Sequence, residues 1–125
     1  MGLFDGLMGN ASTAKAEEVE EELSDLLIDN ENVDVAFKLV RDLIVFTDRR
    51  LIMVDKQGMT GKKTDYHSVP YNSISHFSIE TAGTFDLDAE LKIWISSGAQ
   101  PTISKQFKKD HSIYDIQKML ASKCT

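Results

Sequence analysis

With 125 residues, 42% hydrophobic and 27% charged, the chain has the length of one folded domain and enough apolar side chains for a core. Neither a two-domain protein nor a disordered chain is therefore expected. Twenty acidic against fourteen basic residues give a net charge of -6, which disfavours binding to nucleic acid and to anionic membranes. The sequence contains neither an apolar run of the ~20 residues that a membrane span requires nor a recognisable signal peptide. Its single cysteine, Cys124, cannot form an internal disulfide, and we expect a cytoplasmic protein.

The first twelve residues form a short apolar segment that precedes the single domain predicted for residues 13–125. The segment has four large apolar side chains, too few for an independent helix but unfavourable in water. We expect them either to pack on the domain or a neighbouring subunit, or to belong to a loose end. They are Leu3, Phe4, Leu7 and Met8.

An amphipathic helix is predicted at about residues 14–28. Val19, Leu23, Leu26 and Leu27 recur at the spacing that brings side chains to one face of a helix. Five glutamates cover much of the rest of the surface, and acidic residues early in a helix favour its positive N-terminal end. We interpret this acidic face as solvated surface and assign it no ligand.

Seven short antiparallel strands are predicted between about residues 33 and 107. The strongest pattern runs from Leu87 to Ile95, where apolar residues alternate strictly with polar residues and Trp94, so one face should be buried. Clusters of turn-forming residues separate the strands. The predicted strands are residues 33–40, 43–46, 51–54, 62–69, 74 to about 82, 87–95 and 102–107.

A second helix is predicted at about residues 112–122, with an apolar stripe of Ile113, Ile116 and Leu120. No helices separate the strands, which excludes a parallel sheet with crossover helices. The predicted fold is therefore mainly β, with seven antiparallel strands in two packed sheets or a partly open barrel. The C-terminal helix is expected to cap the barrel, and the N-terminal helix is an addition to it.

An ordered set of short motifs resembles the bacterial pleckstrin-homology domain family. The similarity extends over nearly the whole chain, and the set is specific although no single motif is. The motifs are Gly2–Leu7, Arg41–Asp42, Phe46–Leu51, Asp55–Gly58, Gly61–Lys63, Val69–Tyr71, Glu80–Gly83 with Asp86, and Trp94.

This resemblance implies a seven-stranded pleckstrin-homology-like barrel with a C-terminal helix. It also implies homo-oligomers, often ring-shaped, and no known enzymatic activity. Members of the wider family that bind phosphoinositides usually carry a basic cluster between their first two strands. Here that position holds Arg41 and Asp42, whose charges cancel, so the resemblance does not extend to phosphoinositide binding.

The sequence offers no convincing catalytic, cofactor or metal site. Gly58–Lys63 resembles a phosphate-binding loop, but its glycines are too close together and Lys63 stands where a hydroxyl is required. The three histidines, His67, His76 and His111, lack the short spacing of metal ligands. We therefore expect no enzyme, no cofactor and no metal.

Two groups of residues are candidates for contacts with partners. The local basic patches, Arg49 with Arg50 and Lys62 with Lys63, are the candidate binding residues, although solubility is the more common reason for such lysines and arginines. Trp94, on the polar side of its strand, and the four apolar side chains of the N-terminal segment are the candidate oligomer interface.

The leading hypothesis is a non-enzymatic, self-assembling binding or scaffold module. It would form a homo-oligomer, such as a ring, through open strand edges and apolar contacts, and would bind a protein or peptide partner rather than nucleic acid. The alternative is a peripheral membrane protein that binds anionic phospholipid head groups through the local basic patches.

Overall fold

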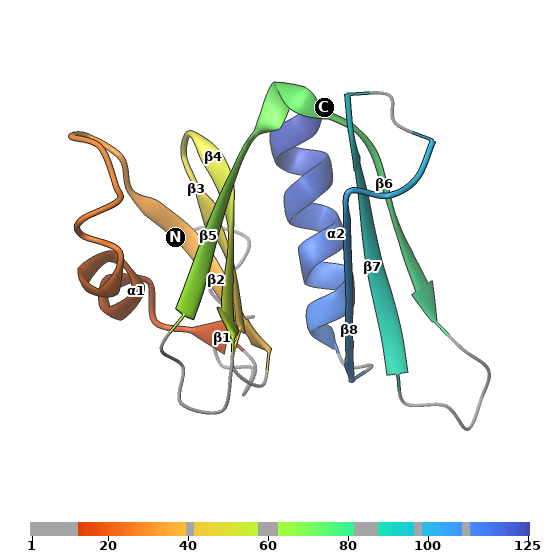
Figure 1. Ribbon diagram of the computed structural model, residues 1–125, viewed down its shortest axis with the longest axis horizontal. Coiled ribbons are helices and arrows are strands. Elements are labelled where there is room, and N and C mark those ends of the chain that lie inside the picture. Colours follow the sequence, from red (N-terminus) through yellow and green to blue (C-terminus); the bar gives the residue numbers. More distant parts are fainter. Residues whose placement is uncertain (1–12, 40–41, 58–62, 82–87, 97–98, 109–110) are drawn as a thin grey trace. The chain divides into compact units, whose positions relative to one another are not determined.

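The computed structural model describes residues 13–39, 42–57, 63–81, 88–96, 99–108 and 111–125 (Figure 1). The chain forms two compact units that follow each other in the sequence, with the division between Pro70 and Tyr71. The predicted apolar segment of residues 1–12 lies outside the described residues, and so does Lys62. None of the described helices is long and apolar enough to cross a membrane.

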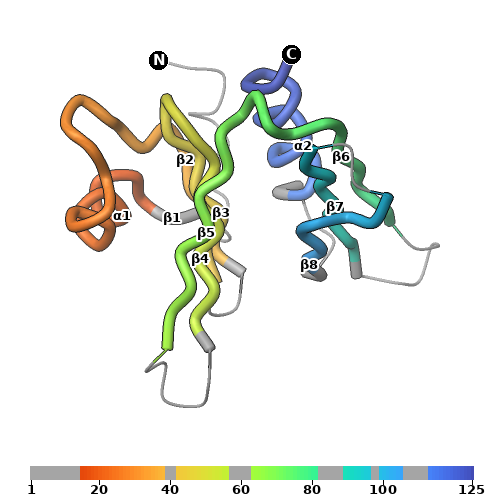
Figure 2. Tube along the Cα trace, turned by 45° about the horizontal axis from the view of Figure 1, so that its top comes forward, coloured from red at the N-terminus to blue at the C-terminus, as the bar shows by residue number. Residues whose placement is uncertain are grey.

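The first unit is an antiparallel sheet with one short helix, α1. Its strands lie in sequence order, β1-β2-β3-β4-β5, and α1 lies against β2 (Figures 1 and 2). The elements are β1 (Thr13–Ala14), α1 (Ala16–Glu22), β2 (Val33–Leu39), β3 (Asp42–Thr47), β4 (Arg50–Gln57) and β5 (Lys63–Pro70).

The central strands of this sheet bury side chains on both faces. On one face Val45 and Ile52 belong to a core cluster with Val19 and Leu23, which come from α1 and its C-terminal end. Side chains of the other face, such as Phe46, are equally buried. This explains why β3 and β4 are almost continuously apolar, since a strand buried on both faces loses the alternation of a half-exposed strand.

The N-terminal helix is shorter than predicted. It ends at Glu22, and the backbone of Leu23 has left the helical region with φ -98° and ψ 16°. Leu26 and Leu27 nevertheless pack against the core cluster from the irregular segment that follows. Apolar periodicity alone could not reveal this, because these leucines face the same core from the turn as they would from a helix. Thr13 and Ala14 instead form a two-residue strand paired with β2.

The second unit contains a three-stranded antiparallel sheet in the order β6-β7-β8 and the C-terminal helix α2, which packs on β6. A single turn of 3-10 helix precedes β6. The elements are the 3-10 turn (Tyr71–Ser73), β6 (Ile74–Thr81), β7 (Asp88–Ile95), β8 (Ile103–Lys108) and α2 (His111–Cys124).

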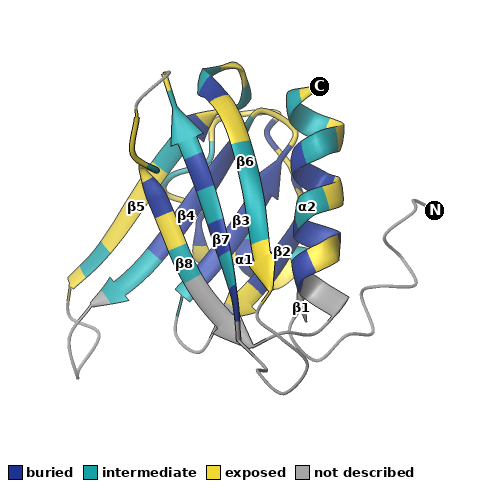
Figure 3. Cartoon of the chain, turned by 90° about the vertical axis from the view of Figure 1, so that its right-hand side faces the viewer, coloured by how far each residue is buried: buried dark blue, intermediate teal, exposed yellow. Residues whose placement is uncertain are grey.

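The predicted alternation in the second unit is confirmed for the middle of β7, whereas Ile95 is only partly buried and Leu87 lies outside the described residues. Ala89, Leu91 and Ile93 of β7 are at most 3% exposed, whereas the intervening residues are partly exposed. The apolar stripe of α2 is buried too, and Figure 3 shows a buried and an exposed side along this helix. All seven predicted strands are present, in addition to the short β1. Among the described residues, hydrogen-bonded strand pairing occurs within each sheet and none joins the two sheets.

Candidate functional site

The hairpin between β3 and β4 is held by the hydroxyl of Thr47. This oxygen accepts hydrogen bonds from the backbone N–H groups of Arg49 at 3.0 Å and Arg50 at 2.9 Å. It donates to the carboxylate of Glu31 at 2.7 Å. A single buried side chain therefore shapes the turn and connects it to the segment that leads from α1 to β2.

Arg50 lies at the centre of this connection. Its Nε and one terminal nitrogen each donate to a different oxygen of Glu31, both at 3.0 Å, which is the two-bonded arrangement that favours an arginine–carboxylate pair. The same terminal nitrogen donates to the carbonyl of Leu26 at 2.9 Å, and the other donates to the hydroxyl of Ser68 at 3.0 Å. The guanidinium thus joins the turn after α1 to β5.

The carboxylate of Glu31 is fully buried. Burial by itself raises the pKa of a carboxyl group, but hydrogen bonds from Arg50, Thr47 and the backbone N–H of Ile28 outweigh it, and the pKa of Glu31 lies below its usual value. Glu31 therefore stays ionised at neutral pH. Through these hydrogen bonds it connects the hairpin to the turn before β2.

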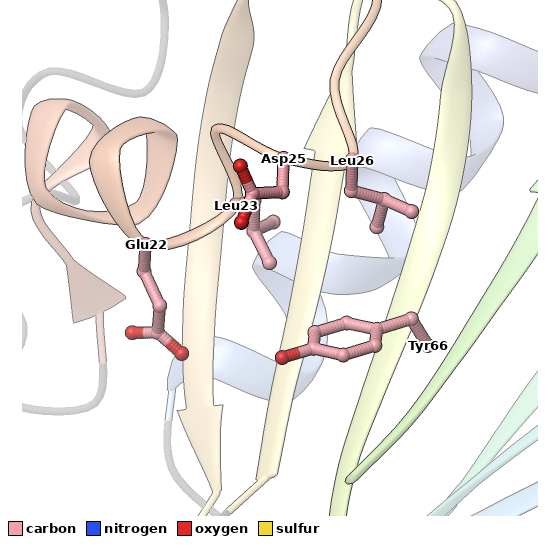
Figure 4. Close-up of a pocket in the computed structure, with 5 residues that line it drawn as sticks. All are labelled: Glu22, Leu23, Asp25, Leu26 and Tyr66. Carbon is pink, nitrogen blue, oxygen red and sulfur yellow. The ribbon is translucent and has the colours of Figure 1, made fainter.

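A cleft of about 220 Å³ lies in the first unit between the end of α1 and β5. Figure 4 shows the ring of Tyr66 extending from β5 towards the turn that carries Leu23, Asp25 and Leu26, with Glu22 from the last residue of α1 beside it. The lining combines two carboxylates, two leucines and one phenol. Leu23 is 1% exposed, so it forms part of the core beneath the cleft, whereas Tyr66 is 45% exposed.

The cleft already has one cation at its edge. The ammonium of Lys56, on β4, lies 3.3 Å from the carboxylate of Glu22, and both side chains are substantially exposed. Among the described residues, Asp25 has no ion pair. The cleft is therefore a small, partly apolar cavity with negative charge at its mouth.

Trp94 lies on β7 directly opposite His76 of β6. The two rings stack with their centres 4.3 Å apart and their planes at 20°, and the indole N–H donates to the carbonyl of Ala99 at 3.4 Å. Because Trp94 is only partly buried, this stack leaves an aromatic surface on the polar side of the strand.

A model of the bacterial PH domain family, PH standing for pleckstrin homology, matches residues 2–124. The chain belongs to this family. Among curated proteins, it is 68% identical to the uncharacterized protein YjqA of Bacillus subtilis (strain 168), over 99% of each chain. It is 32% identical to the uncharacterized protein YozO of the same organism, over 90% of this chain and 95% of the relative.

Two solved structures extend the likeness to the bacterial PH fold. The pleckstrin homology domain from Shewanella amazonensis SB2B is 52% identical over 99% of both chains, with a TM-score of 0.83. A DUF1696 family protein with a pleckstrin-homology domain from Shewanella loihica PV-4 is 48% identical over 91% of this chain and 97% of its own, with a TM-score of 0.79. The predicted PH-like fold is confirmed.

The candidate binding residues of this bacterial PH domain do not form one exposed patch among the described residues. Arg49 and Lys63 are exposed, but the guanidinium of Arg50 is held by Glu31. Lys62 and the four apolar side chains predicted for the interface, Leu3, Phe4, Leu7 and Met8, lie outside the described residues.

The part of this PH domain that the structure describes contains no group of three or more histidine, cysteine, aspartate and glutamate side chains that could hold a metal ion. His67 and His76 lie on strands of different units. Burial raises the pKa of the Cys124 thiol, which disfavours the reactive thiolate.

Sequence reasoning missed the cleft of this domain. The acidic run was interpreted as solvated surface, and Tyr66 was simply one residue of a predicted strand. The available signal was the combination of an aromatic residue on a largely polar strand, KTDYHSVP, with a helix whose last turn is acidic.

Proposed function

We propose that this bacterial PH domain is a non-catalytic module that assembles with copies of itself and binds a protein or peptide segment. The observation that carries the proposal is the cleft beside Tyr66, which adjoins the last strand of its sheet. In the described part of the chain, β5 pairs only with β4, so its other edge presents backbone N–H and C=O groups. Such an edge is a template for an added strand.

Self-assembly is supported by the surface aromatic stack of Trp94 and His76. Large aromatic side chains at a partly exposed position are typical of protein interfaces. A native mass measurement at micromolar concentration is expected to give the mass of two or more subunits of 14.0 kDa each. A mass of one subunit across that range would contradict self-assembly and leave the peptide-binding half of the proposal to its own test.

Peptide binding is tested by selection from a library of random 12-residue peptides with the intact protein as bait. We expect enriched peptides to bind the protein and to lose binding in the Tyr66→Ser variant. Tyr114→Ser is a matched control, because both tyrosines are 45% exposed and Tyr114 lies on α2, in the other unit. The absence of any enriched peptide, or equal loss in both variants, would contradict a peptide site at the cleft.

The alternative, binding of anionic phospholipid head groups, has less support. Arg50 is engaged internally, and the negative charge of the chain is concentrated in the first unit. Residues 1–70 carry fourteen acidic and eight basic side chains, whereas residues 71–125 carry six of each. Co-sedimentation with phosphatidylserine vesicles at low salt, abolished in an Arg49→Gln/Lys63→Gln variant, would favour the lipid alternative instead.

A further inference from the structure

We propose that the bound segment is an extended, basic peptide that adds to the free edge of β5 and inserts a lysine or arginine side chain into the cleft beside Tyr66. This inference rests on the proposed peptide-binding function and specifies the chemistry of the partner. Three features of the cleft carry it: its size, its lining and its position relative to the strand edge.

The size of the cleft fits a single side chain. Sites for small-molecule ligands and cofactors commonly enclose ~300–1,000 Å³. The cleft encloses about 220 Å³, which is below that range. A protein partner therefore fills it with one residue and obtains its remaining contacts from the neighbouring backbone.

The lining matches a long cationic side chain. Lysine and arginine have an apolar stem and a charged end, and they bury the stem while the charge stays at a polar surface. Leu26, which is partly exposed in the lining, offers apolar contact for the stem. Glu22 and Asp25 offer negative charge at the mouth, and the ring of Tyr66 provides an aromatic face for a cation.

A cation of the protein itself already lies at the carboxylate of Glu22, at the edge of the cleft. The ammonium of Lys56 already lies 3.3 Å from Glu22, and the pair is exposed enough for water and a competing cation to reach it. Exposed pairs of this kind are weak, so an incoming lysine or arginine can share or replace Lys56 at this carboxylate. Asp25 is available as well, since no described residue forms an ion pair with it.

The strand edge positions the incoming side chain. In the pairing with β4, Tyr66 stands opposite Val54, which belongs to the core cluster on the α1 face of the sheet. A residue paired with Tyr66 on the free edge would have its Cβ atom roughly 4.5–5.5 Å from that of Tyr66 and would point to the same face. Its side chain would therefore extend along the tyrosine ring towards the end of α1.

The charge distribution selects against acidic peptides. The first unit holds the whole of the net charge of -6, because residues 71–125 are balanced. Seven acidic side chains precede Glu31 between residues 17 and 29. This field attracts a basic segment over a distance and repels an acidic one, and salt should weaken the attraction.

The test measures, by fluorescence anisotropy, the affinity of the intact protein for four labelled ten-residue peptides. In each peptide threonine alternates with a variable position. The central variable residue is lysine, arginine, glutamine or glutamate, and the rest of each peptide is unchanged. We expect the lysine and arginine peptides to bind about tenfold more tightly than the glutamine peptide, and the glutamate peptide to bind most weakly. Raising the salt concentration should narrow the difference between the cationic and neutral peptides.

Two variants with opposite expected effects make the test specific. Asp25→Asn removes one carboxylate and should weaken binding of the lysine peptide by about two- to fivefold. Lys56→Gln releases Glu22 from its internal partner and should strengthen it by a similar factor. A variant that merely destabilised the protein could only weaken binding.

Pairing with β5 is tested by N-methyl groups on alternate backbone amides of the lysine peptide, prepared in both alternating patterns. If the peptide pairs with β5, one of the two patterns should lose binding.

Equal affinity of the lysine and glutamine peptides, or equal affinity of both N-methylated forms and the parent peptide, would overturn this inference. Failure of the proposed function looks different, because the random library would then yield no peptide at all. Enriched library peptides that depend on Tyr66 but lack lysine and arginine would leave peptide binding intact and reject a basic partner.

Discussion

Replacement of Glu31 by glutamine tests whether the buried ion pair holds the first unit together. The substitution keeps the size of the side chain but removes its charge and turns one acceptor oxygen into a donor nitrogen. In the wild type this carboxylate accepts hydrogen bonds from Arg50, Thr47 and the backbone of Ile28. Some of these donors must lose their partner in the variant.

The structure sets the size of the effect. Removal of one partner from a buried ion pair costs roughly 3–5 kcal/mol when the other charge is left without compensation. In the variant Arg50 retains its hydrogen bonds to the carbonyl of Leu26 and the hydroxyl of Ser68, and its side chain is 21% exposed. Its charge is therefore only partly left without compensation. We therefore expect Glu31→Gln to lower the free energy of unfolding by about 2–4 kcal/mol, a large share of a typical stability of about 5–15 kcal/mol.

Urea unfolding followed by far-ultraviolet circular dichroism measures this difference. The control is Glu80→Gln, which removes an exposed partner of Lys92 and is expected to leave the unfolding midpoint unchanged. If the free energy of unfolding of Glu31→Gln lies within about 0.5 kcal/mol of the wild-type value, the hydrogen bonds of Glu31 do not stabilise the unit as we argue.

The pH dependence gives an independent check on the same residue. The pKa of Glu31 is lower in the folded protein than in the unfolded chain, so its ionisation stabilises the fold above the unfolded value of about 4.3. That contribution is lost as the pH falls through the folded pKa. The stability difference between wild type and Glu31→Gln should hold steady from pH 7 to about pH 5 and shrink below about pH 4. A difference that stays constant into acid would refute the assignment to ionisation.

Two further predictions concern packing and backbone geometry, and both are measured by urea unfolding. Ile116→Ala should lower the free energy of unfolding by about 2–4 kcal/mol because Ile116 is fully buried. Tyr114→Ser, on the exposed side of the same helix, should change it little. Equal effects of the two substitutions would contradict the orientation of α2. Asn30 has a positive φ of 67°, so Asn30→Val should cost about 1–2 kcal/mol, and Asn30→Gly should be tolerated. A tolerated valine would mean that the turn adopts another conformation.

The strands and the C-terminal helix were predictable because their signals are local. Alternation along β7 and the stripe of Ile113, Ile116 and Leu120 arise from the geometry of a single element, and turn-forming residues mark where each element stops. The end of α1 was not predictable in this way. Leu26 and Leu27 continue a helical spacing, yet the backbone leaves the helix at Leu23 and the leucines reach the same core from an irregular segment.

The candidate site depended on contacts between residues that are distant in the sequence. Arg50 was grouped with Arg49 as a basic patch, but its carboxylate partner is Glu31, nineteen residues earlier. Trp94 was correctly placed on the polar side of its strand, while its stacking partner His76 came from strand register. The cleft combines the end of a helix, a turn and a strand, so none of its segments carries a recognisable motif.

The sequence by itself determined the class of fold, the number of main strands, the family and the overall excess of negative charge. The tertiary structure decided which charges are engaged internally and which surround an open cleft. The physical reason is that burial along one element follows a short repeat in the sequence. The partner of a polar side chain depends instead on how strands align and where loops return, as the pairing of Arg50 with Glu31 illustrates.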